Sequence, residues 1–441
     1  MSKKYRVGQL DVANAGNTVV VVVKPAMPGS AERAPDVLNK MAARGPRYRV
    51  GLVPSADSRR WDFCDSPGSW CDQSIDISGS DSMQDVLDRV ADHDVTVPIS
   101  ASQSGEYLSV SCDHGIGDSH IVFEVCAAIS QHEPGGGFVE PLAPPTTAYP
   151  LAPALVHTAK ATPRQFVTSA AEMLEPTLAF VGKKFGAGVE AQPAVASTAS
   201  CDQGRDLDPD EKFVAVWAKS SPEFTDEIRR YRDSQHPNAS VTAILTLLIY
   251  KSLEESGVIL HDEVEIVVDM RRFLRRDRST LANFYTVARI DVAGQPSVEG
   301  FSASLRQAAG SLRTLFMLAG HVVVKRLRML AARATKRGGR QPNQPVGSTR
   351  AILTFSEPRA SAFDKIAWAR PEDAEIAVVS PPASRSHISV SVSRAPNGSF
   401  QITATFYASQ ADRSLVAWGL ERALNSEAFM PRAQTISQPA V

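Results

Sequence analysis

Residues 106–130 carry the pattern that most restricts how this chain can fold. In EYLSVSCDH, residues 106–114, apolar and polar side chains alternate with a period of two, which is typical of a β-strand with one buried face. SHIVFEVCAAIS, residues 119–130, follows after two glycines and predicts a helix that is apolar on almost every side. Such a helix has to be buried in the middle of a domain. The pattern therefore indicates an α/β or α+β domain, with helices packed on a sheet.

A long Pro- and Gly-rich region divides the chain into two halves. It runs from residue 131 to about 165, and a second stretch of weak periodicity covers about 186–211. With 441 residues, the chain is long enough for two domains, or two halves of one fold, that each have a core. We predict an N-terminal subdomain over residues 1–165, a crossover helix and linker over 166–211, and a C-terminal subdomain over 212–441.

Both halves contain predicted strands and helices. Strands are expected over about 5–12, 17–23, 106–114, 213–219, 263–270, 284–292, 386–393 and 399–407. Helices are expected near 31–43, 80–94, 119–130, 221–234, 238–257, 298–336 and 412–425.

Charge and composition narrow the class of partner. The 47 Lys and Arg residues balance 48 Asp and Glu residues, so the formal net charge is -1 and no global field attracts nucleic acid or an anionic membrane. The longest aliphatic run, TVVVVVK, is too short to span a bilayer, and the N-terminus lacks the apolar region of a signal peptide. The five cysteines form no CxxC pair, which predicts reduced thiols. We expect a soluble, cytoplasmic, monomeric protein.

His114 is the first candidate for chemistry. An imidazole accepts a proton near neutral pH if it faces a cleft and a neighbour fixes its tautomer. Asp118 follows four residues later, across a turn that Gly115 and Gly117 allow. Taken alone, this pattern also fits chance, with Asp118 capping the next helix. A metal site is not predicted, because His120 and Asp118 have no second cluster of ligands at metal spacing.

Two further motifs, VVDMRRFL and ANFY, follow about 150 residues after His114. The order of these motifs resembles that of the chloramphenicol acetyltransferase-like acyltransferases. This superfamily includes plant BAHD acyltransferases, polyketide-associated acyltransferases, wax ester synthases and the condensation domains of nonribosomal peptide synthetases. The shared features are a strand, His114-Gly-Ile-Gly-Asp118, a buried helix, a Pro-rich crossover, and then VVDMRRFL and ANFY about 150 residues later. The resemblance covers nearly the whole chain as an arrangement of elements. It implies an α/β fold of two such subdomains, each a mixed sheet flanked by helices, that form a pseudo-dimer with a tunnel at their interface.

The resemblance also implies roles for the residues that match. His114 would be the general base, and Asp118 would form a structural ion pair with Arg271 of the Val-Asp-x-Arg motif. Asn283 lies in the stretch that borders the acyl-binding tunnel in relatives, although the usual glycine is absent here. Ser356, in LTFSEP, corresponds to a position near the active centre, and we expect it to contact the substrate or the oxyanion.

Two positions depart from the common HHxxxDG motif. Asp113 replaces the first histidine, and Ser119 replaces the glycine. We count Asp113 among the candidate substrate-binding residues, because it can alter access or the choice of acceptor. Strand alternation directs Asp113 away from His114, which argues against a role in orienting the base.

The implied reaction transfers an acyl group from a thioester to a hydroxyl or amine acceptor. The donor would be a coenzyme A thioester or a phosphopantetheine thioester on an acyl or peptidyl carrier protein, and no permanently bound cofactor or metal is needed. Ester and amide products both remain open, as does a role in natural-product or lipid biosynthesis. The basic stretch 325–340 is a candidate site for the donor's phosphates, and it fits a solvated helix end equally well.

Two other hypotheses remain. Gly117-Asp118-Ser119-His120 also matches a GDS-type hydrolase, with Ser119 as nucleophile and His236 as its base. The spacing is poor, since such enzymes place the serine near the start and the histidine near the end. The other hypothesis keeps the condensation-like fold as a non-catalytic binding module, which the departures at Asp113 and Ser119 allow.

Overall fold

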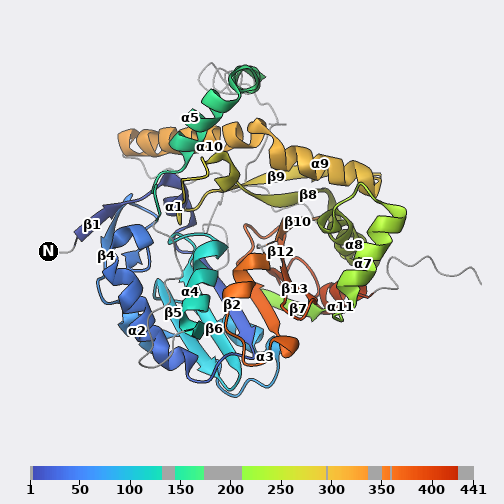
Figure 1. Ribbon diagram of the computed structural model, residues 1–441, viewed down its shortest axis with the longest axis horizontal. Helices are drawn as coiled ribbons and strands as arrows, with labels where there is room; N and C mark the ends of the chain where they lie inside the picture. The colour runs from blue at the N-terminus through green and yellow to red at the C-terminus, as the bar shows by residue number, and fades with distance from the viewer. Residues whose placement is uncertain are drawn as a thin grey trace, which may run out of the picture.

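Two open sheets flanked by helices form most of the molecule (Figure 1). The computed structural model describes residues 3–131, 145–172, 211–294, 296–335, 350–357 and 360–425. One sheet has four strands in the order β11-β2-β6-β5, the other has six in the order β7-β13-β12-β10-β8-β9, and a small sheet has the order β1-β4-β3. This mixed arrangement of strands and helices confirms the predicted α/β class.

The first half contains the small sheet and most of the four-stranded sheet. Its elements are β1 (Lys3–Arg6), α1 (Gln9–Asn14), β2 (Thr18–Lys24), α2 (Ser30–Ala43), β3 (Leu52–Val53), β4 (Arg60–Phe63), α3 (Met83–Asp92), β5 (Ile99–Ser104), β6 (Tyr107–Asp113), α4 (Ser119–Gln131) and α5 (Leu151–Ala161). Helices α2 and α4 share one apolar core with the four-stranded sheet. Every side chain of α4 from Ile121 to Ser130 is buried, as its apolar sequence predicts.

The second half contains the six-stranded sheet and the largest core. Its elements are β7 (Phe213–Lys219), α7 (Phe224–Gln235), α8 (Val241–Glu255), β8 (Leu260–Asp269), β9 (Tyr285–Asp291), α9 (Val298–Gly310), α10 (Leu312–Thr335), β10 (Ala351–Ser356), β11 (Glu375–Val379), β12 (His387–Arg394), β13 (Phe400–Tyr407) and α11 (Arg413–Ala423). Strands β8, β10 and β12 are parallel, and their other neighbours are antiparallel. Helices α7, α8, α9 and α11 contribute to the same core.

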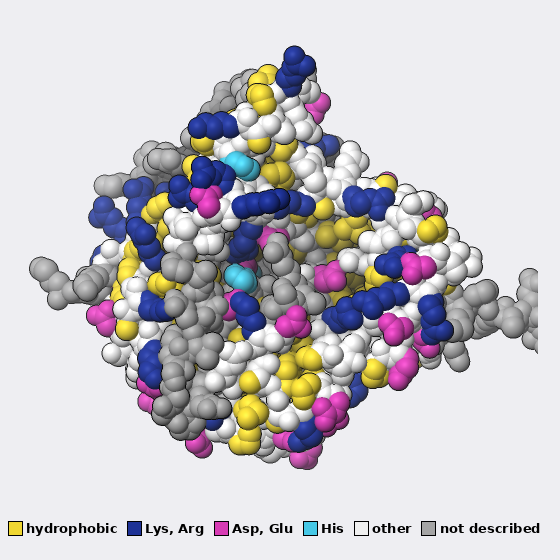
Figure 2. Space-filling model, viewed as in Figure 1, with side chains coloured by type: hydrophobic (Ala, Val, Ile, Leu, Met, Phe, Trp, Pro, Cys, Tyr) yellow, Lys and Arg dark blue, Asp and Glu magenta, His cyan; other side chains and the backbone are white. Residues whose placement is uncertain are grey.

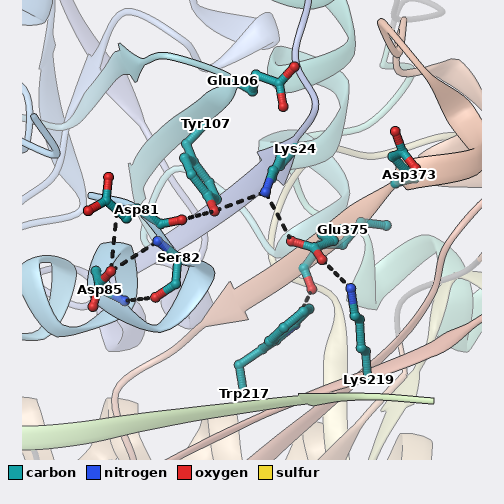
Figure 3. Close-up of polar contacts among 12 residues, drawn as sticks. Lys24, Asp81, Ser82, Asp85, Glu106, Tyr107, Trp217, Lys219, Asp373 and Glu375 are labelled. Carbon is teal, nitrogen blue, oxygen red and sulfur yellow. Dashed lines mark hydrogen bonds and ion pairs between the residues drawn. The ribbon is translucent and has the colours of Figure 1, made fainter. Parts of the chain in front are cut away.

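Strand β11 belongs to the second half of the sequence but to the sheet of the first half. It pairs antiparallel with β2, while the Ile376 and Val378 amides donate to the side chains of Gln401 and Thr403 on β13. Figure 3 shows Glu375 in ion pairs with Lys24 and Lys219, which come from different sheets. The sequence did not predict β11. Because β11 connects the sheets across the proposed subdomain boundary, the two halves form one structural unit.

The structure corrects two predicted elements. Residues 298–336 were expected to form one helix, but α9 ends at Gly310 and α10 begins at Leu312, with Ser311 extended between them. The first strand ends at Arg6, and residues 9–14 form α1, where the Asp11 carboxylate accepts a hydrogen bond from the Gly8 amide at 2.9 Å. A cap of this kind starts a helix because it satisfies an otherwise unpaired amide.

Several sequence predictions lie outside the described residues. These are the first part of the Pro- and Gly-rich region (132–144), most of the linker (173–210) and the end of the basic stretch (336–340), while the side chains of 324–335 are not described. In the described part, the four cysteines are free thiols. No described helix is both long enough and apolar enough to cross a membrane.

Candidate active site

His114 lies directly after β6, in a loop held from two sides. Its backbone amide donates to the Asn17 carbonyl at 2.5 Å, and its carbonyl accepts from Asn283 Nδ2 at 2.7 Å. The half-buried imidazole packs against the Tyr285 ring, with the ring centroids 5.6 Å apart. Within the described chain, its buried Nδ1 has no hydrogen-bond partner. The loop therefore fixes the backbone at His114, whose side chain lies in the wall of the cavity described below.

The turn after His114 requires glycine at two positions. A Cβ atom on Gly115 would lie 2.9 Å from Ala15 Cα, and one on Gly117 would lie 2.6 Å from the Leu281 carbonyl oxygen. Both distances are shorter than van der Waals contact allows. Gly115 lets the turn pack closely on Ala15 in the first half, and Gly117 lets it pack closely on Leu281 in the second half.

Asp118 and Arg271 form the ion pair that the resemblance implied. Arg271 Nη1 lies 2.7 Å from Asp118 Oδ2, across 153 residues of sequence. Arg271 also donates to the carbonyls of Thr280 at 3.2 Å and Ala282 at 3.1 Å. Burial acts to raise the pKa of Asp118, but the Arg271 charge and hydrogen bond outweigh it and lower that pKa. Asp118 is therefore an ionised anchor that joins the two halves.

A buried network that the sequence did not predict supports the same loop. Arg49, which is 2 % exposed, lies 2.9 Å from Asp11 and donates to the carbonyls of Gly115 at 3.0 Å and Ile116. Asp11 Oδ1 also accepts from the Asn283 amide at 3.0 Å. These contacts connect α1, the segment after α2 and the segment before β9. Only the three-dimensional fold brings these residues together.

Asp113 and Asn283 hold the loop and do not line the cavity described below. The Asp113 carboxylate accepts from the backbone amides of Gly16 at 2.9 Å and Gly115 at 2.7 Å, and burial raises its pKa to about 6. Asn283 is 2 % exposed, and its Nδ2 is used by His114 and Asp11. Their predicted contact with substrate therefore finds no support in this geometry.

A cavity of about 520 Å³ lies between the four-stranded and the six-stranded sheet. Figure 2 shows histidine, basic and acidic side chains together near the middle of the face that it displays. Side chains from both halves line the cavity, including those of His114, Asp118, Ser119, His120, Arg271, Tyr285, His321 and Ser356. Of the candidate site residues, the structure thus brings His114, Asp118, Arg271 and Ser356 to one space.

Most of the other charged groups in the cavity wall are paired. Glu124 forms an ion pair with Lys365, and Glu265 lies 3.0 Å from Arg289 Nη2. Burial lowers the pKa of His120, which favours its neutral form. Among the described residues, no group of three or more His, Cys, Asp or Glu side chains is placed to hold a metal ion. The cavity wall thus combines paired charges with the imidazoles of His114, His120 and His321.

The structure does not assemble the Ser119–His236 pair of the hydrolase hypothesis. Ser119 lines the cavity at the start of α4. The His236 ring follows α7, where its Nδ1 lies 2.6 Å from Glu299 and its Nε2 lies 3.2 Å from the Tyr231 hydroxyl. His236 is not in the cavity wall, which agrees with the poor spacing of these residues in the sequence.

Comparison with solved structures identifies the fold. No family model and no curated protein matches the chain. The condensation domain of the Monacolin K polyketide synthase MokA aligns with a TM-score of 0.54 and 12 % identity over 97 % of each chain. TRI3 trichothecene 15-O-acetyltransferase from Fusarium sporotrichioides aligns at 0.53 and 13 % identity, over 97 % of this chain and 95 % of that one. The first condensation domain of the CDA synthetase aligns at 0.51 and 13 %, over 96 % and 97 %.

The chain therefore has the fold shared by condensation domains and chloramphenicol acetyltransferase-like acyltransferases, as the resemblance implied. At this level of identity the similarity defines the fold, and the reaction has to be inferred from the site.

Proposed function

We propose that the protein is an acyltransferase that moves an acyl group from a thioester to a hydroxyl or amine acceptor, with His114 as general base. One observation carries the proposal: His114 lies in the wall of a cavity built by both halves, and the Asp118–Arg271 ion pair anchors its loop across that cavity. The His-x-x-x-Asp motif and this fold occur together in the acyltransferases that the chain resembles.

The reaction needs one group that accepts and returns a proton. The neutral His114 imidazole takes the proton of the acceptor hydroxyl or amine as its oxygen or nitrogen attacks the thioester carbonyl. The tetrahedral intermediate then expels the thiolate, which takes the proton back from His114. Asp118 cannot replace His114 as base, because Arg271 holds it in an ion pair. Ser356, in the same wall, is our candidate donor to the oxyanion.

The donor is proposed to be coenzyme A or a carrier-protein thioester. Two of the structural neighbours are named as condensation domains and the third as an O-acetyltransferase, which supports acyl transfer in general. We accordingly propose an acyl or peptidyl carrier protein as the partner when the donor is carrier-bound, and a cytoplasmic role in natural-product or lipid biosynthesis.

Thiol release tests this proposal. Wild type and His114→Ala are incubated with a panel of acyl-CoA donors, and with the same acyl groups on a carrier protein, together with mixed alcohol and amine acceptors. We expect acceptor-dependent release, reduced about 10²- to 10⁴-fold in His114→Ala. His236→Ala serves as the control, since His236 lies outside the cavity wall.

The other outcomes separate the remaining hypotheses. Equal release by wild type and His114→Ala would exclude His114 as the base. Loss of activity in His236→Ala and Ser119→Ala, with labelling by a serine-directed phosphonate, would favour the hydrolase. No release from any donor, free or carrier-bound, would favour a non-catalytic binding module.

A further inference from the structure

Glu357 places an acidic group in the wall of the cavity of His114. It directly follows Ser356, the last residue of β10, and its side chain is exposed. The Thr242 hydroxyl of α8 donates to Glu357 Oε2 at 2.8 Å. Within the described chain this is the one hydrogen bond to the carboxylate, so Oε1 can accept a hydrogen bond from a group that enters the cavity.

Glu357 differs from the other carboxylates of this wall because no described cation pairs with it. The others form ion pairs with Arg271, Lys365 or Arg289, and they are Asp118, Glu124, Glu265 and Asp269. Burial raises the pKa of Glu357, and only the hydrogen bond from Thr242 opposes this rise. A nearby cation would stabilise the ionised carboxylate, and the described chain supplies none. A ligand that carries a positive charge would therefore fit here.

The two substrates of the proposed reaction differ in charge. Coenzyme A and phosphopantetheine carry phosphates, which a carboxylate repels, so the donor is not the source of a cation. An aliphatic amine on the acceptor is protonated near neutral pH, and its ammonium group supplies both a positive charge and N–H donors for Oε1. An ammonium group has no lone pair and cannot attack the thioester. A group held by Glu357 is therefore different from the hydroxyl or amine that His114 deprotonates.

We infer that Glu357 binds an ammonium group of the acceptor, separate from the hydroxyl or amine that is acylated. This inference rests on the proposed acyl transfer, and it names the acceptors as amino alcohols or diamines. A hydrogen bond to a charged group changes affinity by about tenfold or more. Neutral acceptors of the same shape should bind more weakly by that factor.

Pairs of alcohols that differ only in charge test the inference. One member of each pair ends in a dimethylammonium group and the other in an isopropyl group of the same shape, with the hydroxyl at the far end of a linear chain of varied length. Wild type should bind the ammonium member about tenfold more tightly at the chain length that fits the cavity. Glu357→Gln keeps the shape of the side chain and removes its charge, so both members should bind this variant alike. Glu254→Gln is the matched control and should keep the preference, since Glu254 is exposed on α8 outside the cavity wall.

Calorimetry without an acyl donor makes the result independent of turnover. A preference for the ammonium member that Glu357→Gln abolishes supports the cation site, even if no thiol is released and the proposed acyl transfer fails. Equal binding of the two members to wild type would overturn the inference, as would a preference that survives in Glu357→Gln. Equal weakening of both members by Glu357→Gln would also overturn it, since Glu357 would then only maintain the shape of the cavity. Weaker binding of coenzyme A alone would overturn it too, because Glu357 would then serve the donor.

Discussion

Arg271 connects the His114 loop to the second half of the molecule. Its guanidinium is paired with Asp118 and also donates to the Thr280 and Ala282 carbonyls. Arg271→Ala would leave the Asp118 carboxylate buried without its cation. We therefore expect a loss of about 3 to 5 kcal/mol in the free energy of unfolding, measured by urea denaturation.

Two further variants test whether the loss in unfolding free energy of Arg271→Ala comes from the ion pair with Asp118. Arg275 is mostly exposed and pairs with Asp277, so Arg275→Ala should leave the free energy of unfolding nearly unchanged. Combining Arg271→Ala with Asp118→Asn should recover part of the loss, by a coupling of about 0.5 to 3 kcal/mol. If Arg271→Ala costs no more than Arg275→Ala, the ion pair does not stabilise the fold.

The Asp113 carboxyl predicts a dependence of stability on pH. Burial raises its pKa from the ordinary value of 3.8 to about 6. The folded protein then binds this proton more tightly than the unfolded chain, so the stability from Asp113 is present below about pH 4 and is lost as the pH rises through about 6.

The comparison with Asp113→Asn isolates this effect. The difference in unfolding free energy, wild type minus variant, should fall by up to about 3 kcal/mol between about pH 4 and about pH 7. Urea denaturation at the two pH values measures it, and pH effects common to both proteins cancel. A difference that does not change with pH would show that Asp113 titrates normally in the folded protein.

At the scale of single elements, local patterns predicted most of the fold. The apolar stripe of α3 is buried, and the Ser82 side chain accepts from the Asp85 amide at 3.1 Å, as a helix cap should. Helix α8 begins after the Ser240 cap, and Gly257 follows with φ +99°. These features could be predicted from the sequence because each depends on residues only a few positions apart.

Elements that depend on residues far away in the sequence could not be predicted from the sequence. Strand β11 has five residues, and only its pairing with β2 and its bonds to β13 distinguish it from a loop. The Arg49–Asp11 pair joins residues that no motif connects. His114 and Asp118 stand in one short motif, and Arg271 was assigned through the family resemblance, whereas the buried support around them is set by tertiary packing.

At the scale of the whole molecule, β11 couples the stability of the four-stranded sheet to that of the six-stranded sheet. Its backbone pairs with β2, its Ile376 and Val378 amides donate to side chains of β13, and Ala377 at its centre is fully buried. The cavity of His114 needs both sheets, since its wall includes residues of each. We therefore expect the halves to unfold together, with peptides of β6 and β13 showing the same opening free energy in hydrogen exchange.

Ala377→Pro tests this coupling, because proline cannot donate to the ladder and disfavours the extended pairing. Peptides of β6 should then exchange faster than those of β13, and thiol release should fall because the cavity wall is no longer held. Ala56→Pro is the matched control, since Ala56 is exposed and lies in a turn outside the strands of both sheets. Equal protection of β6 and β13 in the Ala377→Pro protein would mean that the halves are coupled by contacts other than β11. The cavity between them would then not depend on this strand.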